Sequence, residues 1–218
     1  MDNIIIEKVI NNNIISAYEK SGAEVIVMGR GIGFKKKQGE VVPADQISKI
    51  FRIKSRTLAE QFKELLANMP LERVRISDEI ISHAKDHLKL KLNQSIYVTL
   101  TDHINFAIEN VKNGLVISNP MTNEIKHLYE KEMLLGKWAI NHIEKRLSIQ
   151  LPLSEVSGIA LHFINAEQMT TIGTQKDEIT HFIDDITEIV ESEMNIIIDR
   201  NDFNYSRFVT HLKYLLKR

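Results

Sequence analysis

Apolar and turn-forming residues alternate in short segments along the first fifty residues of the chain. The apolar segments are two or three residues long and rich in β-branched side chains, and they fall at Ile4–Ile6, Val9–Ile10, Ile14–Ile15, Val25–Val27 and Val41–Val42. Clusters of asparagine, serine and glycine separate them, at Asn11–Asn13, Ser21–Gly22, Gly29–Gly33 and Gln38–Gly39. Segments with this spacing predict about four short antiparallel strands.

From Thr57 onward the apolar residues recur three or four positions apart, which predicts amphipathic helices packed into a bundle. The first three groups are Leu58, Phe62, Leu65 and Leu66; Ile76, Ile80, Ile81, Ala84 and Leu88; and Leu100, Ile104, Ala107, Ile108 and Val111. Asn119–Pro120 interrupts the series, and a fourth group follows at Ile125, Leu128, Leu135, Trp138, Ile143 and Leu147. Pro152 and Ser154 predict the start of a further helix that continues through His162.

The helical part contains an internal repeat with an offset of 108 residues, the size of one small helical domain. The aligned pairs are His103 with His211, Tyr97 with Tyr205 and Asn93 with Asn201. The first copy continues at least to His162, whereas the second ends seven residues after His211. We therefore expect a chain that is truncated, naturally or by design, within its second copy.

These patterns predict a multidomain protein, with a small antiparallel β-sheet domain at the N-terminus followed by all-α helical bundle domains. We place the sheet domain at residues 1–58, the first helical domain at 66–171 and the start of a truncated second one at 172–218. The strand pattern gives way to the helix pattern near residue 60. A sheet of about 55 residues buries little apolar surface by itself, so we expect it to dimerise.

Composition narrows the possible functions. With 218 residues, 43% of them hydrophobic, the chain is large enough to bury real cores. The absence of cysteine excludes disulfides and thiolate metal sites. Charge interrupts the apolar opening residues too early for a signal peptide, and no apolar run approaches the roughly 18 residues of a membrane span. We expect a cytoplasmic protein.

Charge is distributed unevenly along the chain. Residues 1–56 contain ten Lys or Arg against six Asp or Glu, whereas the remainder contains eighteen against twenty-three. A basic front part attracts polyanions and an acidic remainder repels them. We expect any nucleic acid to contact only the front part.

The front part also carries residues suited to nucleic-acid binding, at Lys8–Asn13 and Met28–Lys37. Arg30 offers a planar fork for phosphate or guanine, and Phe34 offers a face on which a base can stack. Asn11 and Asn13 can donate and accept hydrogen bonds at base edges, whereas Asn12 lies on the opposite side of an extended segment. Gly29–Gly33 lacks the spacing of a dinucleotide fingerprint and opens no helix, so we reject a nucleotide loop.

Purely structural interpretations of these residues remain open. Lys35–Lys37 could form a solvated hairpin edge that discourages aggregation. Asn11 and Asn13 could cap a hairpin turn, which is a common use of asparagine.

Most of the histidines lie in the helical part. His83 and His87 are one helical turn apart with Asp86 nearby, but no third ligand is evident, so an exposed polar helix face is the better interpretation than a metal site. We assign no role to His127, His142 and His181. A lone histidine on an amphipathic helix is usually structural, but the recurrence of His103 and His211 at one phase of the repeat favours a functional role for both.

Four segments, in this order, resemble bacterial transcriptional antiterminators of the BglG/SacY/LicT family. They are Lys8–Asn13, Met28–Lys37, the Thr-Asp-His-Ile-Asn-Phe-Ala-Ile-Glu segment around His103, and the Glu-Val-Ser-Gly-Ile-Ala-Leu-His-Phe-Ile-Asn-Ala-Glu segment around His162. The resemblance covers almost the whole chain. It implies an RNA-binding coantiterminator domain followed by two regulation domains controlled by the sugar phosphotransferase system, the second of which lacks its later half here.

The resemblance also implies partners and site residues. The front domain would bind an RNA hairpin of the leader mRNA as a homodimer, through Lys8, Asn11, Asn13, Gly29, Arg30 and Phe34. The phosphorylation sites would be His103, His162 and His211, and of these His103 and His211 rest also on the repeat. In the family a sugar-specific permease phosphorylates the first regulation domain and thereby inactivates the antiterminator. The phosphocarrier protein phosphorylates the second regulation domain and thereby activates it. No cofactor and no metal are implied.

Two hypotheses follow for the function. The first is a non-enzymatic antiterminator whose dimer is switched by histidine phosphorylation. The second is a helical phosphotransfer or metal-dependent enzyme with a β-rich appendage. The sequence favours the first, because it offers no complete set of acid, base and nucleophile.

Overall fold

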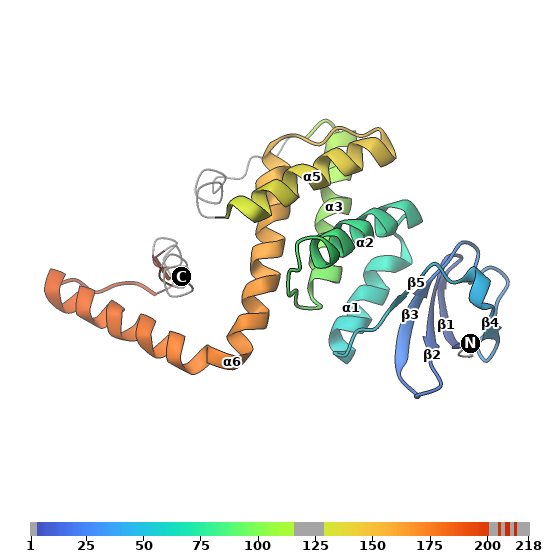
Figure 1. Cartoon of the computed structure of the whole chain (residues 1–218), viewed down its shortest axis with the longest axis horizontal. Helices are drawn as coiled ribbons and strands as arrows, with labels where there is room; N and C mark the ends of the chain where they lie inside the picture. Colours follow the sequence, from blue (N-terminus) through green and yellow to red (C-terminus); the bar gives the residue numbers. More distant parts are fainter. Residues whose placement is uncertain (1–3, 116–128, 201–204, 206–207, 210–211, 213–218) are drawn as a thin grey trace. The chain divides into compact units, whose positions relative to one another are not determined.

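The computed structural model describes residues 4–115 and 129–200, together with 205, 208, 209 and 212, and for 168–181 it describes the backbone only (Figure 1). The chain divides into two compact units, Met1–Glu167 and Gln168–Arg218. The first unit contains a β-sheet and the helices that follow it. The described residues confirm the predicted fold class, an antiparallel sheet followed by helices.

The sheet has five antiparallel strands, one more than the pattern predicts. In the order β4-β1-β2-β3-β5 they are β4 (Val41–Val42), β1 (Ile4–Asn11), β2 (Ile14–Tyr18), β3 (Glu24–Met28) and β5 (Lys49–Phe51). Strand β1 joins two of the predicted segments, because the register with β2 shifts between Ile6 and Lys8 and the strand continues past the irregularity. Strand β5 was missed because it has only three residues and no β-branched run.

Both faces of the sheet are buried, against different partners. On one face Ile6, Ile15 and Val27 pack with Ile32 of the loop after β3. On the other face an apolar cluster joins the sheet to helix α1 (Arg56–Ala67), and its members include Ile14, Ile26, Phe51, Phe62 and Leu66. The sheet therefore covers its second face with a helix of its own chain, which Figure 1 shows beside β3 and β5.

The helices begin close to where the sequence pattern predicts them. After a short 3-10 helix η1 (Ala44–Gln46) and α1 come α2 (Leu71–Asp86), α3 (Ile96–Lys112), α5 (Glu130–Leu147) and α6 (Ser154–Met194). The side chain of Ser55 accepts a hydrogen bond from the backbone N–H of Leu58 and so caps α1. The predicted break at Asn119–Pro120 and the predicted apolar residues Ile125 and Leu128 lie outside the described residues.

Helices α2, α3, α5 and α6 share one apolar core, with Ile80, Ile104, Ile143, Ile159 and Phe163 among its fully buried members. The buried side chain of Arg73 ties α2 to α3, because its guanidinium contacts Asn105 and Glu109 at 2.5 Å each. A Cβ atom at Gly136 would collide with the backbone carbonyl of Val156, so a glycine is needed where α5 meets α6.

Polar contacts hold the sheet to the helices within the first unit. Lys49 Nζ on β5 lies 3.0 Å from Asp78 Oδ1 on α2. The side-chain amide of Gln94 donates to the carbonyl of Arg52 at 2.7 Å and accepts from the backbone N–H of Lys54 at 2.9 Å. Lys63 on α1 contacts Glu24 on β3 at 2.8 Å, and this contact together with the Ser16 hydroxyl lowers the pKa of Glu24. The sheet and the first helices thus form one body, and the domain limits near residues 58, 66 and 171 stay predictions.

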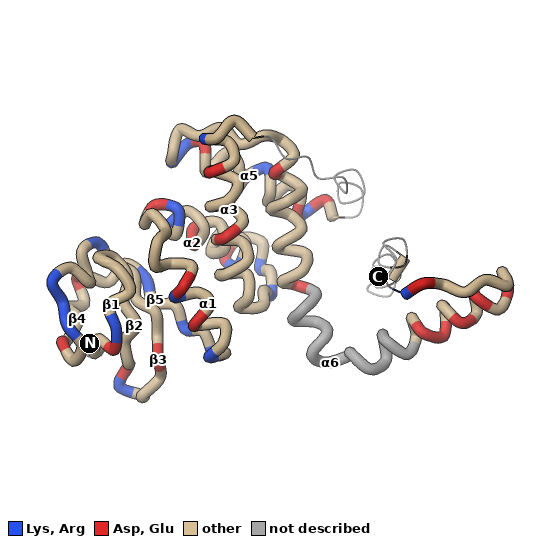
Figure 2. Tube along the Cα trace, turned by 180° about the vertical axis from the view of Figure 1, so that it is seen from behind, with Lys and Arg blue, Asp and Glu red and all other residues tan. Residues whose placement is uncertain are grey.

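In the second unit, α6 continues to Met194 and Thr187 donates to the carbonyl of Ile183 at 2.7 Å. Acidic residues are frequent along these last turns, which Figure 2 shows as red segments. Arg200 lies 3.1 Å from Asp184, and Ile189 and Ile197 are exposed. None of the helices in the described part is long and apolar enough to cross a membrane.

Candidate nucleic-acid interface and histidine pair

The two front motifs meet in space, because the turn after β1 and the loop after β3 are bonded to each other. The N–H of Gly29 donates to the carbonyl of Asn13 at 2.9 Å, and the N–H of Gly33 donates to the carbonyl of Asn12 at 3.0 Å. A further bond joins the Gly31 N–H to the Asn13 side-chain oxygen at 2.9 Å. The fold therefore brings Asn11, Asn13, Gly29, Arg30 and Phe34 into one region.

Glycine is required at two positions of this loop. A Cβ at Gly29 would collide with the carbonyl oxygen of Gln46, and a Cβ at Gly33 would collide with the carbonyl oxygen of Asn11. Gly29 and Gly33 are buried and serve this close packing of backbones. Their direct role is to shape the loop.

The charged and aromatic side chains of the loop point outward. Arg30 is exposed, Phe34 is 56% exposed, and Lys35 Nζ lies 5.4 Å from the centre of the Phe34 ring. More than half of the Phe34 surface is therefore accessible from solvent. Figure 2 shows the basic residues on the loops at the β4 edge of the sheet. Arg30, Phe34 and Lys35 thus present cations and an aromatic face together.

Acidic residues compensate part of this positive charge. Lys36 Nζ lies 3.1 Å from Glu40, and the Lys37 N–H donates to the same carboxylate at 2.8 Å. These two contacts, the Lys36 one first, lower the pKa of Glu40. Lys8 lies exposed on β1, paired in register with Ser16.

The two predicted asparagines use their side chains inside the protein. Asn11 donates from its amide nitrogen to the carbonyl of Leu66 at 2.9 Å and accepts from the N–H of Asn13 at 2.8 Å. Asn13 accepts from Gly31, as described above. These bonds agree with the turn-capping role that the sequence left open. The bond to Leu66 also links the turn to helix α1.

In the helical part, His103 on α3 and His162 on α6 face each other. Their ring centres lie 4.7 Å apart, and the rings are inclined by 44°. The sequence separates these residues by 59 positions, and only the packing of α3 on α6 brings them together. His211, the third predicted phosphorylation site, lies outside the described residues.

Two residues that the sequence analysis missed complete this pair. His103 Nε2 lies 2.9 Å from Glu155 Oε2. The two atoms lie close together but form no aligned hydrogen bond, and Nε2 has no hydrogen-bond partner among the described residues. A Cβ at Gly158 would lie 3.0 Å from His103 Nε2, so the imidazole rests on the backbone of α6. The spacing of Glu155, Gly158 and His162, three and four residues, is the signal that could have grouped them on one helix face.

Burial governs the ionisation of His162. Burial, assisted by the nearby His103, lowers the pKa of His162 to about 4. His162 is therefore a neutral imidazole at physiological pH. A neutral ring nitrogen carries the lone pair that phosphoryl transfer needs.

Two further histidines stack on Trp138. The His83 ring stacks on Trp138 with centres 3.7 Å apart, and the His142 ring stacks on it at 4.8 Å. His142 Nε2 lies 2.6 Å from Glu79 Oε2. The described residues contain no group of three or more His, Asp or Glu that could hold a metal ion. His127 lies outside the described residues, as does the side chain of His181.

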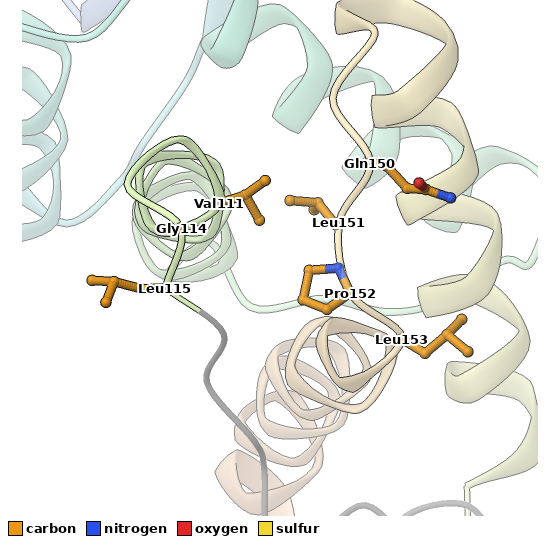
Figure 3. A pocket seen from close by; sticks show the side chains of 7 residues that line it. All are labelled: Val111, Gly114, Leu115, Gln150, Leu151, Pro152 and Leu153. Atoms are coloured by element: carbon orange, nitrogen blue, oxygen red, sulfur yellow. The ribbon is translucent and has the colours of Figure 1, made fainter.

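A hollow of about 340 Å³ lies between the end of α3 and the segment that joins α5 to α6 (Figure 3). Its walls are Val111, Gly114, Leu115, Gln150, Leu151, Pro152 and Leu153. This lining offers no acid, base or nucleophile. The hollow therefore gives no support to the enzyme hypothesis.

Comparison with known proteins assigns a family to each part. Residues 4–60 match the CAT RNA binding domain, and residues 78–166 match the PRD domain. The chain is 44% identical over 216 residues to the transcription antiterminator LicT of Bacillus subtilis (strain 168), which covers 98% of this chain and 76% of that protein. It is 40% identical over 213 residues to the beta-glucoside operon antiterminator of Dickeya chrysanthemi, covering 98% of this chain and 75% of the relative.

A solved structure supports the same organisation. The crystal structure of GlcT CAT-PRDI is 34% identical in sequence and superposes with a TM-score of 0.65, covering 76% of this chain and 98% of that chain. The residues that match the CAT RNA binding domain include the sheet and its outward-facing loop. The residues that match the PRD domain include His103 and His162.

Proposed function

The chain belongs to the BglG/SacY/LicT family of transcription antiterminators, and from this membership we propose that its sheet binds an RNA hairpin of a leader mRNA as a homodimer. The bound hairpin excludes an overlapping terminator hairpin, so that the polymerase reads through. The role is regulatory and not enzymatic. The protein acts where transcripts are made, in the cytoplasm.

The observation that carries this proposal is the loop after β3. It presents Arg30, Phe34 and Lys35 outward while its glycines pack against the turn at Asn11–Asn13. Proteins commonly read the unpaired bases of RNA loops by stacking on aromatic rings and hold the backbone with Arg and Lys. We assign Lys8, Arg30 and Phe34 to direct RNA contacts, and Asn11, Asn13 and Gly29 to the same surface, which their internal bonds shape.

The homodimer is supported by an apolar row on the sheet. Ile5 pairs with both Val41 and Tyr18 in neighbouring strands, and all three side chains are about half exposed. They share the sheet face that α1 covers only in part. A second sheet packed on this row would bury it. This agrees with the expectation that a small sheet domain dimerises, because it buries little apolar surface by itself.

Regulation is assigned to the histidines. We propose that His103 and His162 accept phosphoryl groups from partners in the sugar phosphotransferase system, the sugar-specific permease and the phosphocarrier protein, with His211 as the site of the second regulation domain. The support is the pairing of His103 with His162 at 4.7 Å. Each phosphoryl group adds a charge of about −1.5 to −2. Such a charge changes the packing of α3 on α6 and with it the balance between subunit arrangements.

The test is a titration of the whole chain with a short leader hairpin. Binding should weaken steeply as salt rises, because Lys and Arg contacts release counterions from the RNA. Arg30→Ala should abolish binding while the dimer persists in sedimentation. Lys54→Ala is the matched control, because Lys54 is also exposed and lies beyond the opposite end of the sheet. Unchanged affinity of the Arg30 variant would refute the assigned surface.

A further inference from the structure

His103 presents its two ring nitrogens to different surroundings, and the phosphoacceptor role proposed above leaves open which of them reacts. We propose that Glu155 and Gly158 are positioning residues that hold His103 Nε2 against helix α6 and leave Nδ1 as the atom that accepts the phosphoryl group. This inference rests on the proposed function and specifies its chemistry. It concerns only residues of the first unit, where α3 and the start of α6 pack together.

Access to the two nitrogens differs. The His103 side chain is 22% exposed, but its Nε2 atom is shielded from solvent and has no aligned hydrogen-bond partner in the described part of the chain. The exposure that remains therefore belongs to other atoms of the side chain. An incoming phosphorus atom needs a free approach along the nitrogen lone pair, and Nε2 offers none.

The blockage does not depend on which way the ring is turned. A Cβ at Gly158 would lie 3.0 Å from Nε2 and 3.1 Å from Cε1, so both atoms of this edge of the ring lie close to Gly158 on α6. Turning the ring by 180° exchanges these two atoms and leaves Nε2 against α6. Nδ1 is not among the three atoms that lie nearest to such a Cβ.

Charge adds to the steric argument. Glu155 Oε2 lies 2.9 Å from Nε2, and the Glu155 side chain is only 11% exposed. A phosphoryl group on Nε2 would place about two negative charges against this carboxylate, where little water screens the repulsion. The same carboxylate attracts a proton on Nε2, and a neutral ring with its proton on Nε2 has its lone pair on Nδ1.

The transfer balances without a further reactant. The donor is a phosphohistidine of a phosphocarrier protein or a small phosphoramidate. Its P–N bond breaks as the Nδ1 lone pair of His103 forms a new P–N bond. The donor nitrogen leaves with the electron pair, and the Nε2 proton of His103 stays in place beside Glu155.

The experiment phosphorylates the whole chain with potassium phosphoramidate and records ³¹P NMR spectra, which separate Nδ1-phosphohistidine from Nε2-phosphohistidine. The signal lost in His103→Asn belongs to His103, and His103→Gln confirms the assignment. We expect the Nδ1 form of His103 to exceed the Nε2 form about tenfold, a ratio that corresponds to about 1.4 kcal/mol. His87 is the internal reference, since it is exposed at the end of α2.

Two variants test the positioning role. Glu155→Gln should reduce the Nδ1 excess at His103 by several fold, and Glu155→Asp should restore part of it, whereas the isomer ratio at His87 stays unchanged. Circular dichroism verifies that each variant is folded. A merely structural role of Glu155 would change the amount of phosphorylation without changing the isomer ratio.

The outcomes separate the inference from the proposed function. A His103 signal mainly at Nε2 overturns the inference and leaves the phosphoacceptor role intact. An isomer ratio unchanged in Glu155→Gln removes Glu155 from the positioning role. Absence of any His103 signal, also with a histidine-phosphorylated phosphocarrier protein as donor, overturns both.

Discussion

Asn11 and Leu66 are joined by a hydrogen bond of 2.9 Å from the side-chain amide of the first to the backbone carbonyl of the second. This bond ties the turn that shapes the proposed RNA surface to the helix α1 that follows the sheet. The same asparagine accepts from the Asn13 N–H. The geometry of the RNA surface is therefore coupled to the position of α1.

Replacing Asn11 by alanine removes both bonds. We expect the free energy of unfolding to fall by about 1 to 2 kcal/mol, because the Asn13 N–H and one lone pair of the Leu66 carbonyl lose their partner. Urea denaturation measures the change. Asn12→Ala is the matched control and should change the stability by less than about 0.5 kcal/mol, since Asn12 is exposed and bonds through its backbone. Equal effects of the two variants would contradict the proposed importance of the Asn11 bonds.

His162 should make the stability of the protein depend on pH. Its pKa is about 4 in the folded state and ordinarily 6.5, so between these values the unfolded chain binds a proton that the folded one does not. The contribution of the neutral His162 to the free energy of unfolding is fully present above pH 6.5. It is lost as the pH falls towards 4, which lowers the free energy of unfolding by about 3 kcal/mol. In His162→Asn the fall in stability between pH 7.5 and 4.5, measured by urea denaturation, should be smaller by that amount. His87→Asn should retain the wild-type dependence.

Trp138 reports on the histidines that stack on it, and it is the single tryptophan of the chain. Burial first, and then the neighbouring His87 and His142, lower the pKa of His83 below 6.5. Protonation of a stacked imidazole should quench the indole emission, so the fluorescence should fall as the pH decreases. His83→Gln should remove the part of this transition that lies below pH 6.5. A titration curve that is identical in the variant would show that His83 does not control the emission.

The ion pair between Lys49 and Asp78 holds β5 to α2 at 3.0 Å. Burial raises the pKa of Asp78 even though Lys49 opposes the shift. Lys49→Met should destabilise the fold by about 1 to 3 kcal/mol at pH 7, because a poorly solvated carboxylate loses its partner. Lowering the pH to 5 should relieve part of this loss as Asp78 takes up a proton. The double variant Lys49→Met with Asp78→Leu should be more stable than Lys49→Met alone, and thermal unfolding measures all three.

Much of the secondary structure could be predicted from the sequence, because strands and helices impose different periods on the apolar residues. The helices around Phe62, Ile80 and Ile104 follow the predicted groups closely. Strand β5 could not be found, since its three residues pair with β3 by tertiary contact and show no pattern of their own. The exposure of Arg30 and Phe34 fits the predicted RNA surface, whereas the internal bonds of Asn11 and Asn13 needed the structure to be seen.

The sequence alone determined which residue types are present and how they are ordered along each element: a basic, glycine-rich front part, amphipathic helices and a repeated histidine. Only the tertiary structure decided which of them meet. Helix packing places Glu155 and Gly158 against His103, and it places His83 and His142 against Trp138. The physical reason is that periodicity is a local property of the chain, whereas ring environments and buried charges depend on contacts between residues that lie tens of positions apart.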